Sequence, residues 1–435
     1  METILGVAGV FVMLALILAL GTSPGLAMLL TGLAGILALA PAGDFWHTVL
    51  NGFTGQEMWG VFSNYGFTVI PLFVFLGEVI FHAGYSDRLF RAARVWFGHT
   101  RGGLAITTIL ASAGFSCVCG SNTATAATMT AVAQRPMRHA GYHPELGSGA
   151  IAVGSTLGAV IPPSIVLVVY GLYIGEKAPI HKLFAAAMAP GFLLAAMMIL
   201  TVKFLCRRHP DWAPVTRRGS RRRRLAVLPP VLEVAVLFGV VMAALFSGKI
   251  SPTEAAGVGA CLGLAGCALR GRLSWRKLRL ATEATLRITG MVFLILAGAT
   301  VFGKFLVLSH LPQGLTEAIA SSHMPGIAVI LLMSLCYLVG GCLMDALAFL
   351  LISLPLFQPL LESLGYDLVW FGQVVCLITT LGAVTPPIGV SCFVVAGQPG
   401  APPMETVFKG AMRFLPAYVL VYVLLLLWPL VQSGF

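Results

Sequence analysis

Charged residues are scarce in this 435-residue chain. Asp, Glu, Lys and Arg make up 10% of it, against about 25% in an ordinary soluble domain, while 58% of the residues are hydrophobic. A soluble fold cannot bury that much apolar surface, because exposed surface grows too fast with size. The composition excludes a soluble enzyme, a nucleic-acid-binding domain and a disordered chain. It predicts an all-α polytopic membrane protein, since the apolar runs are continuous rather than alternating.

Metal-binding and catalytic motifs are also missing. No CxxC pair occurs among the nine Cys, most of which lie in apolar runs, so we expect neither a disulfide framework nor a metal cluster. The chain contains no HExxH and no GxSxG sequence. Residues 298–304 have the spacing of a phosphate-binding loop, but Phe305 follows where Ser or Thr is needed. We therefore predict no enzyme activity, no ATP site and no cofactor.

The positive charge is confined to a few loops. Residues 207–224 contain eight Arg and one Asp, and residues 270–279 contain four Arg and one Lys, so that the rest of the chain is close to neutral. Short basic loops between spans mark the cytoplasmic side. Residues 103–134 have basic flanks on both sides, whereas no Lys or Arg occurs between Lys304 and Lys409. The loops of this second region are therefore expected on the outer side.

Ten apolar segments are long enough to cross about 30 Å of hydrocarbon. They are residues 3–21, 25–41, 66–84, 146–175, 184–206, 228–247, 253–269, 287–308, 368–397 and 404–432. Residues 43–63 carry aromatic side chains among polar ones, which indicates a helix lying along the membrane surface. Two further apolar stretches, 103–134 and 323–361, are interrupted by small or polar residues, and each is either a re-entrant hairpin or a pair of spans. The charge pattern predicts that they enter from opposite faces, with both termini outside.

An internal repeat connects the two halves of the chain. The sequence TLGAVIPP at 156–163 recurs as TLGAVTPP at 380–387, with seven of eight positions identical at an offset of 224. The same offset aligns His99 with His323 and Phe184 with Phe408. Because the charge argument starts the two copies on opposite sides, they are inverted repeats. Inverted repeats with broken helices are typical of secondary transporters, whose sites lie near the middle of the bilayer.

This repeat divides the chain into four parts. Residues 1–65 form N-terminal spans and the surface helix, which act as a scaffold. Residues 66–206 form the first repeat, with hairpin 103–134 and broken helix 146–175. Residues 207–286 form basic loops and a linking pair of spans. Residues 287–435 form the second repeat, with hairpin 323–361 and broken helix 368–397.

The Pro-Pro pairs explain why these helices break. Proline lacks a backbone donor and clashes with the preceding turn, so a helix cannot run through Pro162 and Pro163 or through Pro386 and Pro387. Unwinding frees carbonyl oxygens at bilayer depth, where each is costly unless satisfied. Hard cations take oxygen ligands, so the breaks can bind one. The alternative is a simple kink whose carbonyls are satisfied by neighbouring helices.

The centres of the two interrupted stretches complement the breaks. Residues 120–128 (GSNTATAAT) are small and polar, which suits an alkali cation and an oxygen-rich solute, although Ser, Thr and Ala also pack membrane helices together. The second centre carries Asp345, which the offset aligns with Ser121. A carboxylate at this depth is usually functional or paired. Asp345 is therefore either a helix cap or a cation ligand, and the two roles are compatible.

Six stretches taken in order resemble the large membrane subunit, of the DctM type, of tripartite ATP-independent periplasmic (TRAP) transporters. They are residues 71–78, 101–105, 120–128, 158–163, 341–355 and 382–389. The resemblance implies an elevator-type transporter of the ion-transporter superfamily in the bacterial inner membrane. It implies Na⁺ as coupling ion and an organic acid, such as a C4-dicarboxylate or sugar acid, as substrate. A small four-helix membrane subunit and a periplasmic substrate-binding protein are the implied partners.

The resemblance also implies site residues by position. One Na⁺ site would use Ser121, Asn122, Gly158, Ile161 and Pro163, and a second would use Met344, Asp345, Gly382, Thr385 and Pro387. The substrate would lie against Ser121, Asn122, Thr123, Thr125, Pro162 and Pro386. Because the tip at 121–123 also resembles that of divalent-anion/sodium symporters of the same superfamily, a stand-alone symporter is an alternative. A membrane enzyme or an assembly scaffold is a more distant one.

The charge pattern makes a testable prediction about sidedness. In a background without reactive native cysteines, Ser220→Cys is expected to react with an impermeant thiol reagent only from the cytoplasm, because residues 207–224 are strongly basic. Ser363→Cys is expected to react only from the periplasm. Labelling of both positions from the same side would contradict the inverted repeat.

Overall fold

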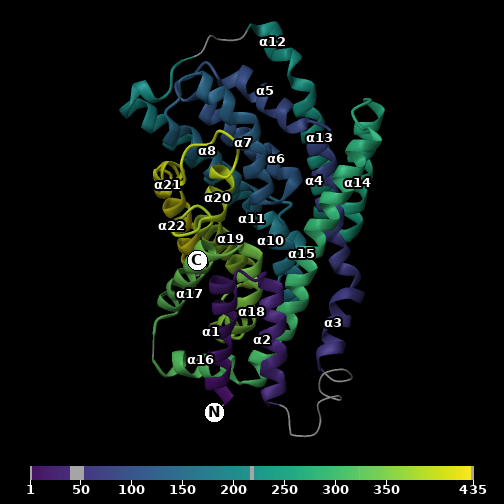
Figure 1. Ribbon diagram of the computed structural model, residues 1–435, viewed down its shortest axis with the longest axis vertical. Helices are drawn as coiled ribbons and strands as arrows, with labels where there is room; N and C mark the ends of the chain where they lie inside the picture. The colour runs from purple at the N-terminus through teal and green to yellow at the C-terminus, as the bar shows by residue number, and fades with distance from the viewer. Residues whose placement is uncertain (1, 40–52, 216–219, 323, 433–435) are drawn as a thin grey trace.

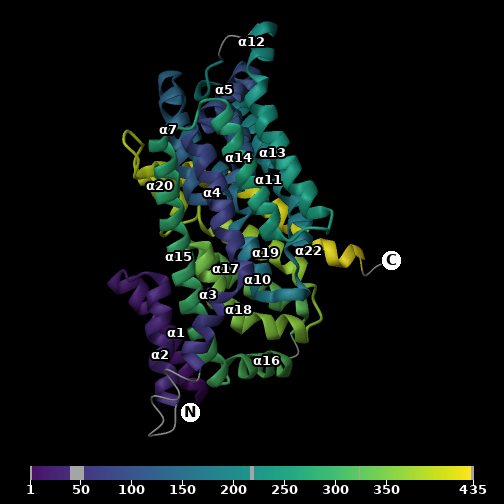
Figure 2. The same cartoon turned by 90° about the vertical axis from the view of Figure 1, so that its right-hand side faces the viewer.

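The computed structural model describes residues 2–39, 53–215, 220–322 and 324–432. Every regular element in these ranges is a helix, as the composition predicts, and the described residues form no strand. The helices pack into an elongated bundle, shown along its length in Figure 1 and turned by 90° in Figure 2.

In the described residues of the first half, the chain forms eleven α-helices and three short 3-10 helices. They are α1 (Glu2–Leu20), α2 (Pro24–Leu39), α3 (Phe53–Ser63), η2 (Tyr65–Thr68), α4 (Val69–His82), α5 (Tyr85–Phe97), α6 (Gly103–Cys119), α7 (Asn122–His139), α8 (Pro144–Ser155), α9 (Leu157–Val160), α10 (Ile165–Ile174), η3 (Gly175–Lys177), α11 (Ile180–Arg208) and η4 (Pro210–Trp212).

The second half continues with α12 (Arg221–Ala226), α13 (Leu228–Phe246), α14 (Pro252–Leu269), α15 (Trp275–Leu308), α16 (Leu311–Ser321), α17 (Gly326–Leu343), α18 (Ala346–Ser363), α19 (Leu368–Gly382), α20 (Val390–Ala396), α21 (Met404–Met412) and α22 (Leu415–Gln432). The first residues of several of these helices repeat those of the first half at a constant spacing. Helices α7 and α18, α8 and α19, and α11 and α21 each begin 224 residues apart. Helices α13 and α14 hold the same place in the order of the second half as α1 and α2 hold in the first. The sequence analysis assigned them to a linking pair.

Nine segments of the described residues are long and apolar enough to cross a membrane, and α21 with α22, bent by 45°, makes a tenth. The chain is thus a multi-pass membrane protein. The set differs from the predicted ten because α17 and α18 are each long enough to cross, while α2 and α19 are shorter apolar helices. Figure 1 places α6 and α7 in the upper half of the molecule, and α17 and α18 in the lower half.

A polar cluster ties the second basic segment, 270–279, to helices α13 and α5 at one end of the molecule. Glu233 of α13 forms an ion pair with Arg270 at 2.7 Å and accepts a hydrogen bond from Arg272 at 3.2 Å, and both arginines lie in the α14–α15 turn. Tyr85, at the start of α5, donates to Glu233 at 2.6 Å. Burial, followed by the hydrogen bond to Glu233, raises the pKa of Tyr85 to about 12. The phenol therefore stays protonated and donating at any physiological pH.

The described part of segment 43–63 differs from its prediction. Phe62 of α3 stacks on Phe293 with ring centroids 5.8 Å apart, and Glu57 lies 3.5 Å from Lys304. Phe293 and Lys304 follow one another along α15, so α3 runs lengthwise beside that helix, as Figure 1 shows. For residues 53–63 a helix flat on the membrane surface is therefore the wrong orientation, because helix packing holds it upright. Residues 43–52 lie outside the described residues.

Helices α2 and α15 approach each other at backbone distance. A Cβ on Gly298 would collide with the carbonyl oxygen of Gly25, and a Cβ on Gly32 would lie 2.7 Å from the amide nitrogen of Phe302. Small residues that let backbones meet are typical of membrane helix pairs, where lipid offers no hydrophobic driving force. The α2–α15 pair is therefore a rigid part of the lower half.

This packing predicts that Gly298→Ala is destabilising by about 1–3 kcal/mol, the usual cost of overpacking. The matched control is Gly290→Ala on the same helix, where a Cβ would meet nothing within 4 Å. The control is expected to be neutral or slightly stabilising, since Ala is the better helix former. Thermal unfolding of the two purified variants in detergent measures the difference. Equal melting temperatures would contradict the contact.

Candidate functional site

The first broken helix is interrupted where its Pro-Pro pair predicts. Helix α9 ends at Val160, Ile161 is extended with φ −83° and ψ 124°, and α10 begins at Ile165. The hydroxyl of Ser164 accepts from the Leu167 amide at 3.4 Å and so caps α10. All residues from 161 to 165 are buried. The break is an enclosed stretch of irregular backbone.

The tip of the α6–α7 hairpin sits directly on this break. The amide of Ile165 donates to the carbonyl oxygen of Gly120 at 3.3 Å. A Cβ on Gly120 would lie 2.5 Å from the carbonyl oxygen of Pro163, and a Cβ on Gly158 would lie 2.7 Å from that of Ser121. Glycine is needed at both positions for this approach. The structure thus brings Ser121, Gly158 and Pro163 together, although they are far apart in the chain.

Several oxygen atoms in this region are poorly satisfied. The Oδ1 atom of Asn122 is buried and has no hydrogen-bond partner among the described residues. In a continuous helix the carbonyl of Gly158 would accept from the amide of the residue four positions later. That residue is Pro162, which has no N–H to donate. Ser121 Oγ accepts only a long bond of 3.5 Å from Ala124 and lies 3.2 Å from Thr123 Oγ1. Such a set of neutral oxygens is chemically suited to a hard cation.

The remaining residues predicted for the first site lie around this tip. Thr125 is buried and its hydroxyl donates to the carbonyl oxygen of Ser121 at 2.7 Å. The amide of Ile161 donates to Leu157 at 2.8 Å. Pro162 is buried within the break. Their assignment to Na⁺ or substrate stays a prediction.

The second broken helix has the same sequence motif but a different environment. Helix α19 ends at Gly382, whose carbonyl accepts from the Thr385 amide at 3.0 Å, while Thr385 Oγ1 donates to Leu381 at 2.7 Å. The Ser391 amide donates to Ala383 at 2.9 Å. Pro386 and Pro387 are exposed, in contrast to the buried first pair. Its break is open to the surroundings.

The second hairpin contacts its break through residues that lie about one helical turn earlier in the hairpin than the contacting residues of the first hairpin do. A Cβ on Gly382 would lie 2.6 Å from the carbonyl carbon of Gly341, and the Gly389 amide donates to Cys342 at 3.1 Å. Of the residues predicted for the second Na⁺ site, Gly382 thus packs on the hairpin. The assignment of Met344, Asp345, Gly382, Thr385 and Pro387 to a Na⁺ site stays a prediction.

Asp345 caps helix α18. Its Oδ2 accepts from the Leu347 amide at 3.1 Å, and its φ and ψ of −63° and 145° are those of a residue before a helix. The cap role is thus observed, and the role of cation ligand stays a prediction. Both hairpins place a helix N-terminus at the tip, because Ser121 caps α7 in the same way.

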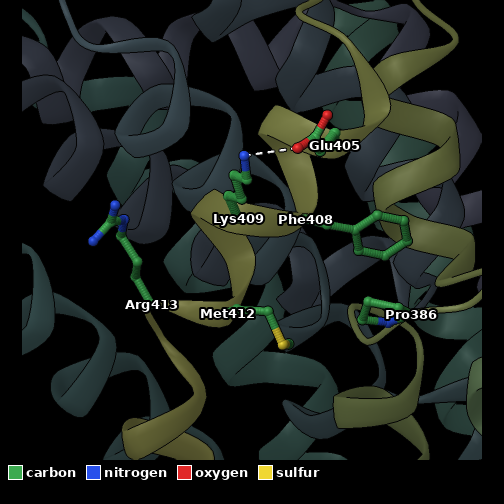
Figure 3. Close-up of a pocket in the computed structure, with 6 residues that line it drawn as sticks. All are labelled: Pro386, Glu405, Phe408, Lys409, Met412 and Arg413. Carbon is green, nitrogen blue, oxygen red and sulfur yellow. Dashed lines mark ion pairs between the residues drawn. The ribbon is translucent and has the colours of Figure 1, made fainter.

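A cavity of about 550 Å³ opens beside the second break and was missed by the sequence analysis. Figure 3 shows the six side chains that line it: Pro386, Glu405, Phe408, Lys409, Met412 and Arg413. Lys409 pairs with Glu405 at 2.7 Å, and the ring of Phe408 lies near Pro386. Helices α20 and α21 lie in the upper half of Figure 1, the half that also contains the basic helix α12. The cavity beside the second break thus lies in the half of the molecule that is predicted to be cytoplasmic.

Arg413 turns away from Pro386 in Figure 3. Its Nε and Nη2 atoms bind Glu145 Oε2 at 2.8 and 2.7 Å, and its guanidinium lies over the ring of Trp212 at 4.6 Å. This contact ties α21 to α8 of the other repeat. The sequence signal for these residues was weak, because Lys409 and Arg413 stand out only as the first basic residues after a long stretch without any.

The cap geometry predicts how Asp345 variants behave. Asp345→Ala is expected to cost about 1 kcal/mol of stability, whereas Asp345→Asn keeps the cap and is expected near wild type. Asp367→Ala is the matched control, because Asp367 caps α19 through a 2.9 Å bond from Val369. Thermal unfolding measures the cap. If Asp345 also binds Na⁺, Asp345→Asn weakens Na⁺ affinity at unchanged melting temperature, and Asp367→Asn does not.

Comparisons with known proteins identify the family. The family model described as "DctM: Tripartite ATP-independent periplasmic transporter, DctM component" matches residues 11–431. The sialic acid TRAP transporter large permease protein SiaM of Vibrio cholerae is 30% identical over 87% of each chain. The C4-dicarboxylate TRAP transporter large permease protein DctM of Pseudomonas aeruginosa is 30% identical over 81% of this chain and 82% of its own. The ectoine/5-hydroxyectoine large permease protein UehC of Ruegeria pomeroyi is 28% identical over 86% of each.

Among solved structures, the fold is similar to that of the YdaH transporter of Alcanivorax borkumensis, with a TM-score of 0.67 over 95% of this chain and 99% of the other. At 17% identity, this likeness concerns the fold alone. The family is one of transporter permeases of the bacterial inner membrane, and its tripartite nature implies a small membrane subunit and a periplasmic binding protein. The match over residues 11–431, with relatives aligned over most of their length, shows that this chain belongs to the DctM family of large TRAP permease subunits.

Proposed function

We propose that this permease imports an organic acid by coupling it to Na⁺. The observation that carries the proposal is the contact between the α6–α7 tip and the first broken helix. There, the Asn122 Oδ1 atom has no partner among the described residues, and the Gly158 carbonyl has lost its helical donor to Pro162. Backbone and amide oxygens at bilayer depth are costly unless something replaces water. A Na⁺ ion supplies that replacement with no need for a carboxylate ligand.

The helix N-termini at the tips support an anionic substrate. Helix α7 begins after Ser121 and α10 begins after Ser164, and both ends lie at the same break. Unpaired amides and the helix dipole make such ends favourable for a carboxylate. The names of the three relatives cover sialic acid, C4-dicarboxylate and ectoine, which all carry a carboxylate. The proposed substrate class is therefore an organic acid, without a choice among its members.

The difference between the two breaks supports an elevator-type movement. The first break is buried under its hairpin tip, and the second opens to the cavity beside Pro386. In the proposed cycle the two hairpins and broken helices move together past the helices α2, α4, α14 and α15. The periplasmic binding protein delivers substrate when the opposite break opens, and the small membrane subunit stabilises the static helices. The present arrangement corresponds to the state open toward the basic end.

Reconstitution in liposomes with the small subunit and the binding protein tests the coupling. Uptake is expected to require a Na⁺ gradient. Asn122→Ala is expected to raise the Na⁺ concentration for half-maximal uptake roughly tenfold, the effect of losing one hydrogen bond or ligand contact to a charge. Thr385→Ala is expected to shift it in the same direction if the second site exists. Uptake is read as radiolabelled organic acid retained per permease.

The matched control is Asn64→Ala, which removes the same side chain from an exposed cap where Asn64 Oδ1 accepts from Gly66 at 2.8 Å. It is expected to leave Na⁺ dependence unchanged. Full uptake in Na⁺-free vesicles driven by a proton gradient would refute the proposed coupling ion. Uptake that proceeds equally well without a binding protein would instead favour the stand-alone symporter.

A further inference from the structure

An arginine at the basic end of the molecule has no anionic partner among the described residues. Arg224 ends the run of four arginines in α12, and its Nε and Nη2 atoms are buried without a hydrogen-bond partner in the described part of the chain. A guanidinium keeps its charge under all physiological conditions. A buried charge without hydrogen bonds is strongly unfavourable, so these two N–H groups require an oxyanion.

Helix α5 holds this guanidinium in place. The Arg224 Cζ atom lies 5.6 Å from the centre of the Trp96 ring, and Trp96 Nε1 donates to the Arg224 carbonyl at 3.3 Å. Stacking on an indole leaves the edge of the guanidinium free to make two parallel hydrogen bonds. Trp96 therefore orients Arg224 without neutralising it.

In the part of the chain that the structure describes, no carboxylate pairs with Arg224. The only acidic residue of α5 is Asp87, nine residues before Trp96 and so about 13 Å away along the helix axis. The segment 216–219, which precedes α12, contains no Asp or Glu in its sequence. The described residues thus supply no anion for the two N–H groups of Arg224.

The surroundings of Arg224 are those of a membrane interface. The span α13 begins at Leu228, one turn after Arg224. Trp96 is 36% exposed, Phe97 41% and Leu225 59%, so apolar side chains project beside the charge. Helix α5 is amphipathic, with Leu89 buried and Arg91 and Arg94 exposed. An amphipathic basic helix with exposed aromatic residues is typical of an element that lies at the level of lipid headgroups.

We propose that Arg224 and Trp96 form a binding site for an anionic phospholipid. The phosphate oxygens accept from Nε and Nη2 of Arg224, and the upper acyl chain packs on Trp96 and Phe97. Arg91 and Arg94 add a favourable potential without direct contact. Because α5 leads through residues 98–102 into the α6–α7 hairpin, the bound lipid anchors the helix from which the first hairpin hangs. This site is independent of the proposed Na⁺ and substrate sites.

Native mass spectrometry of the purified full chain tests the proposal. The probes are phosphatidylglycerol and phosphatidylcholine with identical acyl chains. Wild-type protein is expected to retain phosphatidylglycerol more strongly, and Arg224→Gln is expected to lose roughly tenfold in affinity for it, as for a charge-assisted hydrogen bond. Arg224→Lys keeps the charge but not the planar pair of donors. Its affinity for phosphatidylglycerol is expected to lie between those of the wild type and Arg224→Gln.

Arg276→Gln is the matched control, because Arg276 is an exposed arginine at the start of α15, at the same end of the molecule. It is expected to bind phosphatidylglycerol as the wild type does. Equal losses in Arg224→Gln and Arg276→Gln would show only a diffuse charge effect and overturn the proposal. Equal retention of phosphatidylcholine, or displacement of the lipid by millimolar inorganic phosphate, would overturn it as well. A Trp96→Leu variant, which leaves Arg224 in place, is expected to weaken lipid retention. It tests the site independently if Arg224→Gln does not fold.

Discussion

The whole fold is constrained by the need to satisfy backbone oxygens that cannot reach water. Each Pro-Pro pair removes the donors that two carbonyls of the preceding turn would use, and in hydrocarbon each such carbonyl must find another partner. The Ala159 carbonyl, freed by Pro163, accepts from the Cys376 thiol at 3.0 Å. Its counterpart Ala383 accepts from the Ser391 amide at 2.9 Å. Cys376 belongs to the second broken helix, so the two breaks are held close by the need to satisfy the first.

The same motif nevertheless gives two different environments. In the second copy, the carbonyl of Gly382 is satisfied by the amide of Thr385, which tightens the turn before the prolines. In the first copy, Ile161 donates to Leu157 instead, and Gly158 packs against the hairpin tip, where a Cβ would lie 2.7 Å from the carbonyl oxygen of Ser121. One identity difference in eight residues thus coincides with a tight but exposed break in one repeat and a buried, enclosed break in the other. This asymmetry is the observation on which the proposed elevator-type movement rests.

Much of this architecture was predictable from proline chemistry and charge. The positions of both breaks follow from the steric rules for proline, and the turns between α6 and α7 and between α17 and α18 fall at the small or polar residues inside apolar runs. The orientation of α3 was not predictable, because Phe62 looks interfacial until Phe293 is placed beside it. The cavity at Pro386 and the ion pair of Arg413 with Glu145 were also missed, since both depend on contacts between the two repeats. Local rules place the breaks, whereas long-range packing decides which of them is open.

The connecting helices of the two halves are unequal in chemistry, although the two halves repeat the same sequence motif. Helix α5 begins at Tyr85, which is bound to Glu233 and covered by the Arg272 guanidinium at 5.0 Å from its ring. Helix α16 begins after His310, which has a φ of 54° and lies 3.7 Å from Glu2 at the exposed edge of α1. A partly buried network of charge-assisted hydrogen bonds is stronger than one exposed pair that depends on histidine protonation. The hairpin at the basic end is therefore held more firmly to its surrounding helices than the hairpin at the opposite end. In the proposed elevator-type movement, the α16 connection is the weaker of the two.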